Sequence, residues 1–232
     1  MKKRGMITAM VTAGLAASAA VCEKTPVGVK LDVFGTNVWE LVVDNPEGRP
    51  YVHPLSLADG TVATDLRPDD HIWHLGLWFS LKFVNGINFW EPAVKGGCEP
   101  EGKTTVTDWK AKTDGAAATV LISLEYAARA NAGDVLLTEK REMEFSAPDA
   151  NGGYSIRFKH RLTAKKDIVL GRSEPKRNSE GEMRGGYAGL TLRLRKEVAD
   201  LAVADNLHEG TATLGMGKSG GIRISQLKAP PF

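Results

Sequence analysis

The sequence predicts an all-β protein built as an antiparallel β-sandwich. Short extended runs recur along the chain at spacings of about 10–20 residues, as they do in β-sandwiches. Asn85-Gly86 stands between two apolar runs and indicates a hairpin, because both residues tolerate positive φ. Helical periodicity over three turns is nowhere persuasive beyond the first twenty or so residues.

Several of the predicted strands are runs in which apolar and polar or charged residues alternate, wholly or in part. Glu139–Phe145 alternates charge with bulk, and Leu190–Leu194 alternates cleanly. The predicted strands are Val29–Val43 (a hairpin turning at Gly35-Thr36-Asn37), Tyr51–Leu57, Leu77–Val84, Thr104–Trp109, Thr119–Ala127, Val135–Phe145, Tyr154–Thr163 and Leu190–Leu194.

Two later segments interrupt this pattern. Ser173–Gly186 is polar and is expected to form a long loop within one domain. Val198–Leu207 is the best helical alternative, although it is short. No linker separates two cores, so residues 22–232 are predicted to form a single domain.

The first residues have the order of a secretory signal peptide. Lys2-Lys3-Arg4 is followed by the uncharged, mainly apolar run Gly5–Val21, in which Ala17-Ser18-Ala19 matches a cleavage site. Residues 1–21 are therefore predicted to be a signal peptide, and the mature protein periplasmic or extracellular. The alternatives are an uncleaved anchor and a lipid attached to Cys22. No other segment approaches the length of a membrane span.

Charge and cysteine content limit the partners. The chain has 30 Lys and Arg against 28 Asp and Glu, and removal of the basic leader makes the balance slightly negative. We expect no nucleic-acid partner. A Cys22–Cys98 disulfide is feasible in an oxidising compartment, and the two cysteines lack the spacing of a zinc or redox motif.

The chemically dense segment is Arg67–Glu91. Asp70, His71 and His74 are the candidate catalytic residues there, and Glu91 is a fourth. His71 and His74 share a face if Pro68-Asp69-Asp70 starts a loop or tight turn, and point apart on a strand.

Two imidazoles with Asp70 suit general acid–base catalysis. With His53 or Glu91 added, the same groups suit a divalent metal, which is not the favoured interpretation. The alternative is that the histidines bind backbone in a Trp-rich core.

Aromatic residues in this segment have two interpretations. Trp73, between the histidines, is either a stacking platform for a sugar ring or a core residue, and with His53 it is the candidate for substrate binding. Trp78 lies within a strand pattern and is predicted to be core.

Charged residues outside this segment are predicted to be structural. Glu139, Arg141, Glu142 and Arg161 are expected to form cross-strand ion pairs on a sheet face. His160 and His208 are predicted to be surface residues.

The motifs Arg49–Leu55, Asp70–Phe79 and Val84–Trp90 together resemble the PmoA-like family of secreted β proteins, a domain of unknown function. Weaker matches are Glu139–Arg141 and Gly185–Leu190. The resemblance implies a β-sandwich of the galactose-mutarotase-like kind, in which a concave sheet face often holds a sugar. Leu75 stands where many members carry Arg, and members are usually longer, so closing strands at the C-terminal end are expected to be missing or replaced.

Two functions follow as hypotheses. The first is a secreted carbohydrate-active enzyme with a His/Asp site on a concave sheet face. The second is a non-catalytic carbohydrate-binding or cell-envelope protein of the same fold, with Trp73 as its platform. The expected partner is therefore a small molecule or glycan.

Overall fold

The computed structural model describes residues 20–92, 99–174, 176–177, 179, 183–184, 189–198, 201–205, 209–211 and 222–226. All the regular elements of this part of the chain are β-strands, and their pairing is antiparallel. None of the described residues belong to a helix long and apolar enough to cross a bilayer. The prediction of an all-β fold is confirmed.

One large sheet has six strands in the order β1-β2-β3-β4-β5-β15. Its first five strands follow chain order, and β15 joins β5 from more than a hundred residues further on. This long-range pairing places the segment after β15 beside the loop before β5. The strands are β1 (Val21–Lys24), β2 (Gly28–Val33), β3 (Thr36–Val42), β4 (Tyr51–Leu55), β5 (Leu77–Ser80) and β15 (Gly189–Leu192).

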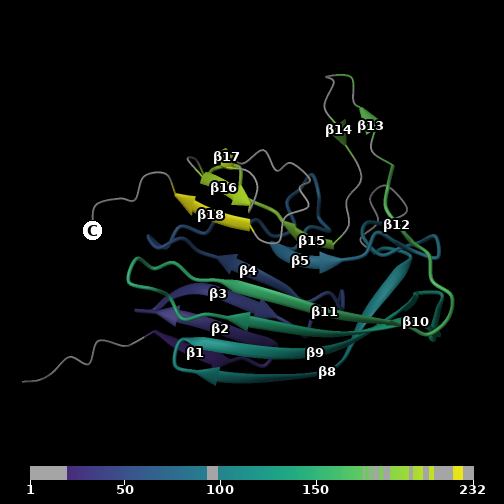
Figure 1. Cartoon of the computed structure of the whole chain (residues 1–232), viewed down its shortest axis with the longest axis horizontal. Helices are drawn as coiled ribbons and strands as arrows, with labels where there is room; N and C mark the ends of the chain where they lie inside the picture. Colours follow the sequence, from purple (N-terminus) through teal and green to yellow (C-terminus); the bar gives the residue numbers. More distant parts are fainter. Residues whose placement is uncertain are drawn as a thin grey trace, which may run out of the picture.

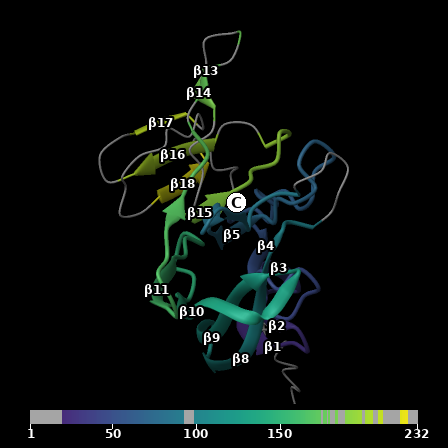
Figure 2. The same cartoon turned by 90° about the vertical axis from the view of Figure 1, so that its right-hand side faces the viewer.

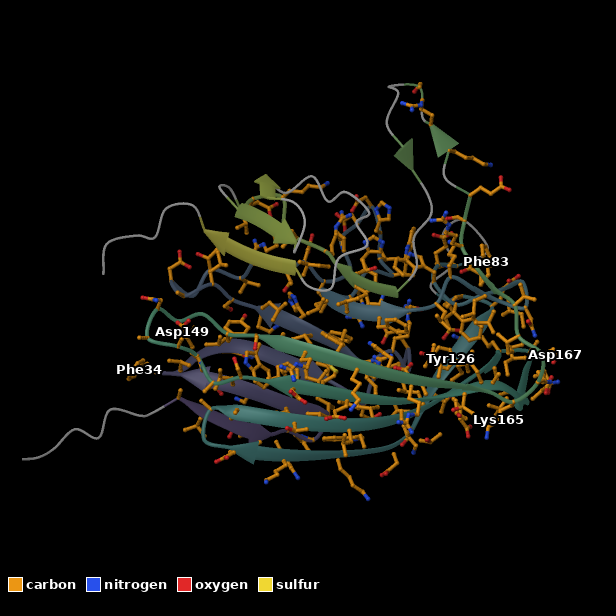
Figure 3. All side chains as sticks on the ribbon, in the orientation of Figure 1. Phe34, Phe83, Tyr126, Asp149, Lys165 and Asp167 are labelled. Carbon is orange, nitrogen blue, oxygen red and sulfur yellow. The ribbon has the colours of Figure 1, made fainter. Side chains whose placement is uncertain are left out.

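The second large sheet has four long strands in the order β11-β10-β9-β8. Consecutive strands pair as hairpins, so the sheet forms from local contacts. Its strands are β8 (Gly102–Asp114), β9 (Ala117–Ala128), β10 (Asn131–Phe145) and β11 (Ile156–Ala164). Figure 3 labels Phe34 and Asp149 at one end of the long strands, and Lys165 and Asp167 at the other.

Short strands complete the described part of the chain. Figures 1 and 2 both place β16 to β18 on the side of the molecule away from β1 and β8. The short strands are β6 (Phe83–Val84), β7 (Ile87–Asn88), β12 (Leu170–Gly171), β13 (Lys176–Arg177), β14 (Met183–Arg184), β16 (Leu201–Asp205), β17 (Glu209–Thr211) and β18 (Ile222–Gln226).

The main core lies between the two large sheets. Trp39 of β3 stacks on Phe145 of β10 with ring centroids 4.1 Å apart, and Phe79 of β5 stacks on His160 of β11 at the same distance. Alternate residues such as Leu41 and Val52 point into this core. Burial of these apolar faces is what holds the sheets together.

A second, smaller cluster lies on the other face of the six-stranded sheet. Tyr51 and Trp78 are paired across β4 and β5, and each alternates with a residue of the main core, Val52 and Leu77. Because successive strand residues face opposite sides, this aromatic cluster lies on the outer face of the sheet. It includes Trp90 and gives the candidate site its floor.

Two predicted turns and one predicted alternative helix lie within the described residues, the helix in part. Asn85 and Gly86 have φ of 50° and 79° and join β6 to β7, so the hairpin is confirmed. The β2–β3 turn lies at Phe34-Gly35, slightly earlier than predicted. The helical alternative for Val198–Leu207 is wrong, because Leu201–Asp205 is strand β16, held by backbone pairing to β17 and β18.

The export and disulfide predictions fall largely outside the described residues, which exclude 1–19 and Cys98. Cys22 is a free, buried thiol within β1. Burial, followed by the charge of Glu23, raises the pKa of this thiol to about 11. Its side chain packs in the main core.

Candidate functional site

The two histidines of the dense segment lie on a compact loop between β4 and β5. Antiparallel bridging of Leu66 with Leu75 closes the loop at its base. Inside it, the amide of His71 donates to the carbonyl of Pro68 (2.8 Å), and that of His74 donates to the carbonyl of His71 (2.9 Å). These are turns, as the Pro68-Asp69-Asp70 segment predicted, and they bring His71 and His74 to one side.

Gly76 fixes where this loop meets the sheet. Its φ is 71°, and a Cβ at this position would lie 2.6 Å from the carbonyl oxygen of Val52. Only glycine allows this conformation and this approach without strain. The amide of Arg193 also donates to the carbonyl of Gly76 at 2.7 Å, so the loop is tied to the segment that follows β15.

The rings of His71 and His74 are neighbours. Their centroids are 4.6 Å apart, and Trp73 lies against both, at 5.1 Å from His71 and 5.9 Å from His74. The side chain of His71 is 40% exposed. Two imidazoles and an indole therefore form one half-exposed surface, which is the geometry expected if the segment forms a turn.

Asp70 connects this surface to a distant part of the chain. Both of its carboxylate oxygens accept hydrogen bonds from Nη2 of Arg193, at 2.8 and 2.9 Å. Oδ2 also lies 3.0 Å from Nδ1 of His71, close enough for an ion pair, although that nitrogen makes no well-aligned hydrogen bond. The hydrogen bond from Arg193, with a smaller effect of His71, lowers the pKa of Asp70 to about 2, so Asp70 is ionised.

His74 lies deeper, on the aromatic floor. Its ring centroid is 5.0 Å from that of Trp78 and 6.4 Å from that of Trp90, and those two tryptophans are 5.5 Å apart. Burial, then the electrostatic effect of His71 and Arg193, lowers the pKa of His74 to about 4. His74 is therefore a neutral imidazole at neutral pH, and its buried Nδ1 has no hydrogen-bond partner.

The other predicted site residues have other partners. His53 lies within β4, where its Nδ1 is 2.9 Å from the hydroxyl of Thr64, and burial lowers its pKa. Glu91 follows β7 and pairs with the buried ammonium group of Lys82. The predicted roles of His53 in substrate binding and of Glu91 in catalysis remain predictions. Trp78 is 1% exposed, which agrees with its predicted place in a core.

No cluster of three or more His, Cys, Asp or Glu side chains able to hold a metal ion occurs within the described residues. Four side chains of the loop lie together: Asp70, His71, Trp73 and His74. They offer a carboxylate, two imidazoles and an aromatic face.

A second polar cluster lies in the core, where the sequence did not predict one. Glu139 is fully buried between the sheets, where it accepts hydrogen bonds from Nε and Nη2 of Arg141 (2.7 and 3.1 Å) and from the hydroxyl of Tyr126. Nδ1 of His160 lies 2.7 Å from it. Tyr126 is labelled in Figure 3.

The predictions for these residues are corrected. Glu139 and Arg141 pair within one strand, in the core, and His160 is half-buried against Phe79 instead of lying on the surface. Alternation of E-K-R-E showed which residues share a face, but not that this face is the inner one. Glu142 does form the expected cross-strand pair, with Lys159 at 3.4 Å, whereas Arg161 lies opposite Lys140.

Fold and site together define an all-β sandwich that carries a His/Asp/Trp surface on the outer face of its larger sheet. The chain belongs to a family described as a family of unknown function (DUF6807), whose model matches residues 28–223. No curated protein and no solved structure matches the chain.

Proposed function

We propose that the protein binds a carbohydrate on the surface formed by Asp70, His71, Trp73 and His74 and performs acid–base chemistry on it. The observation that carries this proposal is the mutual packing of the rings of His71, Trp73 and His74, with Asp70 beside His71. An indole face suits the C–H face of a sugar ring, and the surrounding polar groups suit its hydroxyls.

His71 is the proposed acid–base residue. Its Nδ1 faces the ionised carboxylate of Asp70, which leaves Nε2 for a ligand hydroxyl. Asp70 is itself held by Arg193, so Asp70 acts as a positioning residue. His74 is neutral and half-buried, so it can hydrogen-bond a ligand without adding charge.

The same reasoning extends to location and relationship. The basic start, the apolar run and Ala17-Ser18-Ala19 support export from the cytoplasm, and a carbohydrate of the cell envelope or the surroundings is then the natural ligand. The motif Asp70–Phe79 supports a relationship with PmoA-like proteins and, through them, with mutarotase-like sandwiches. That relationship bears on fold more than on chemistry.

A non-catalytic sugar-binding protein is the second candidate, and one observation favours it. Common glycoside hydrolases use two carboxyl groups on either side of the bond. Here Glu91 is paired with Lys82, and Asp70 with Arg193. Neither carboxylate is therefore free in the way that such a mechanism requires.

The test is calorimetric titration of the mature protein with neutral hexoses, amino sugars, uronic acids and their short oligomers. Substitution His71→Ala is expected to weaken binding by about tenfold, the effect of losing one hydrogen bond to the ligand, and Asp70→Asn is expected to weaken it because His71 and Arg193 lose the group that orients them. Asp108→Asn, an exposed carboxylate on β8, is the matched control. NMR of the incubated sugars then separates an enzyme from a binding protein. Failure of every sugar in the panel to bind the wild type would overturn the proposal.

A further inference from the structure

Buried charges in the described part of the chain come in pairs, with one exception. Its four buried charged side chains are Arg49, Lys82, Glu139 and Arg141. Arg141 contacts Glu139, and Lys82 contacts Glu91. Arg49, which is 3% exposed, has no carboxylate of the described residues within ion-pair distance, and the charge of Glu47 acts on it only from further away. A buried cation without an ion pair is costly, so its presence calls for a reason.

Arg49 lies beneath the candidate site. Its Nη1 donates to the backbone carbonyl of Trp90 at 3.0 Å, and Trp90 is part of the aromatic floor that His74 touches. The charge of Arg49 also contributes to the lowered pKa of His74, in agreement with a position near the site. Burial lowers its pKa to about 10, so the guanidinium still carries its charge at neutral pH.

Uncommitted hydrogen-bond donors outnumber acceptors around this floor. Nε of Arg49 and Nε1 of both Trp73 and Trp78 are buried without partners, and each of them can only donate. The comparable acceptors are Oε2 of Glu47, whose other oxygen is bound to Arg67, and Nδ1 of His74 in one of its tautomers, whereas Nδ1 of His71 faces a carboxylate and acts as a donor. This surplus of donors makes the surroundings of the floor favourable to an anion.

The exposed edge of the site, which we call the rim, also has a surplus of hydrogen-bond donors. Arg193 is 20% exposed there, and only its Nη2 is bound to Asp70. Trp73 is half-buried with its indole N–H covered, so a ligand arriving over the loop meets the ring of Trp73 and the guanidinium of Arg193. Arg49 acts from below, where a low dielectric lets its charge reach over several ångströms.

From these observations we infer that the ligand is an anionic sugar, with its carboxylate or sulfate group directed to the remaining guanidinium N–H groups of Arg193, above the charge of Arg49. This inference rests on the proposed function and narrows its substrate class. Asp70 is consistent with it, because both of its oxygens are occupied by Arg193, and it therefore orients that guanidinium.

The test compares matched ligands by calorimetry: glucuronate with glucose, a galacturonate trimer with a galactose trimer, and glucose 6-sulfate as the second kind of anion. We expect each acidic sugar to bind about tenfold or more tightly than its neutral partner, and to lose affinity as salt rises. Whichever anion gains more identifies the group as carboxylate or sulfate. Equal affinity for acidic and neutral sugars would refute the inference but keep the proposed function; no binding at all would refute both.

Two variants test whether Arg49 and Arg193 cause the preference for acidic sugars. Arg49→Met is expected to reduce the affinity for acidic sugars more than for neutral ones, with little change in melting temperature, because removal of an unpaired buried charge offsets the lost hydrogen bond to Trp90. A purely structural arginine would give the opposite, a lower melting temperature with an unchanged preference. Arg193→Gln tests the same preference from the half-exposed rim if Arg49→Met does not fold. Arg157→Gln, a 76% exposed arginine on β11, is the control.

Discussion

Removing one charge from the buried Glu139–Arg141 pair should be among the most damaging single changes in this protein. The side chain of Glu139 has no exposed surface, and that of Arg141 is 1% exposed. Tyr126 and His160 contact the same carboxylate, so three strands of the four-stranded sheet meet at it. Replacing either partner leaves the other as a buried charge without compensation.

The structure sets the magnitude. Breaking a buried pair by removing one partner costs about 3–5 kcal/mol, which is a large part of the ~5–15 kcal/mol by which a domain is stable. We therefore expect Glu139→Gln and Arg141→Met each to lower the free energy of unfolding by about 3 kcal/mol or more. The double variant should lose less free energy of unfolding than the sum of the two single losses, because the second change removes the charge that the first leaves unpaired.

Acid provides an independent measure of the same pair. Burial alone would raise the pKa of Glu139, but contacts from His160, Arg141 and Tyr126 outweigh it and lower the pKa from 4.5 to about 2. A pKa lowered by folding adds stability that is complete above pH 4.5 and is lost as the pH falls toward 2. The displacement corresponds to about 3 kcal/mol.

Urea denaturation followed by tryptophan fluorescence, at pH 7 and at several pH values down to 3, measures both effects. Glu142→Gln is the control, because its pair with Lys159 is exposed and should change stability by less than about 0.5 kcal/mol. The reasoning is refuted if Glu139→Gln costs no more than this control. It is equally refuted if the variant and the wild type lose stability in parallel over the acid range.

Two further predictions concern groups whose pKa is displaced. Cys22, buried and with its pKa raised to about 11, should react with iodoacetamide far more slowly in native Cys98→Ser protein than after unfolding in urea; equal rates would show that it is not in the core. The ring of His74, with its pKa lowered to about 4, should show no NMR titration between pH 5.5 and 8. Because folding lowers this pKa, His74 should cost stability as the pH falls below 6.5, and a midpoint near 6.5 would contradict the burial of its ring.

Local signals in the sequence determined most of the strands. Alternation and β-branched content are properties of neighbouring residues, so β8 to β11 and the β2–β3 pair could be located from the amino-acid pattern alone. The hairpin at Asn85-Gly86 was equally predictable, because its φ values are a property of those two residues. The loop that carries His71 and His74 also followed from local chemistry at Pro68-Asp69-Asp70.

Only the tertiary structure decided which distant groups meet. Asp70 is fixed by Arg193, which is 123 residues away in sequence, and nothing local to either residue predicts that bond. Alternation gives two faces to a strand but not which face is buried, so Glu139 and His160 were assigned to the wrong environment. Glu91 pairs with the buried ammonium of Lys82, a partner that the sequence did not indicate. The physical reason is the same in these three cases. The partner of a charged side chain is whichever group lies within a few ångströms of it, and that group is brought there by long-range strand pairing and by packing of the sheets.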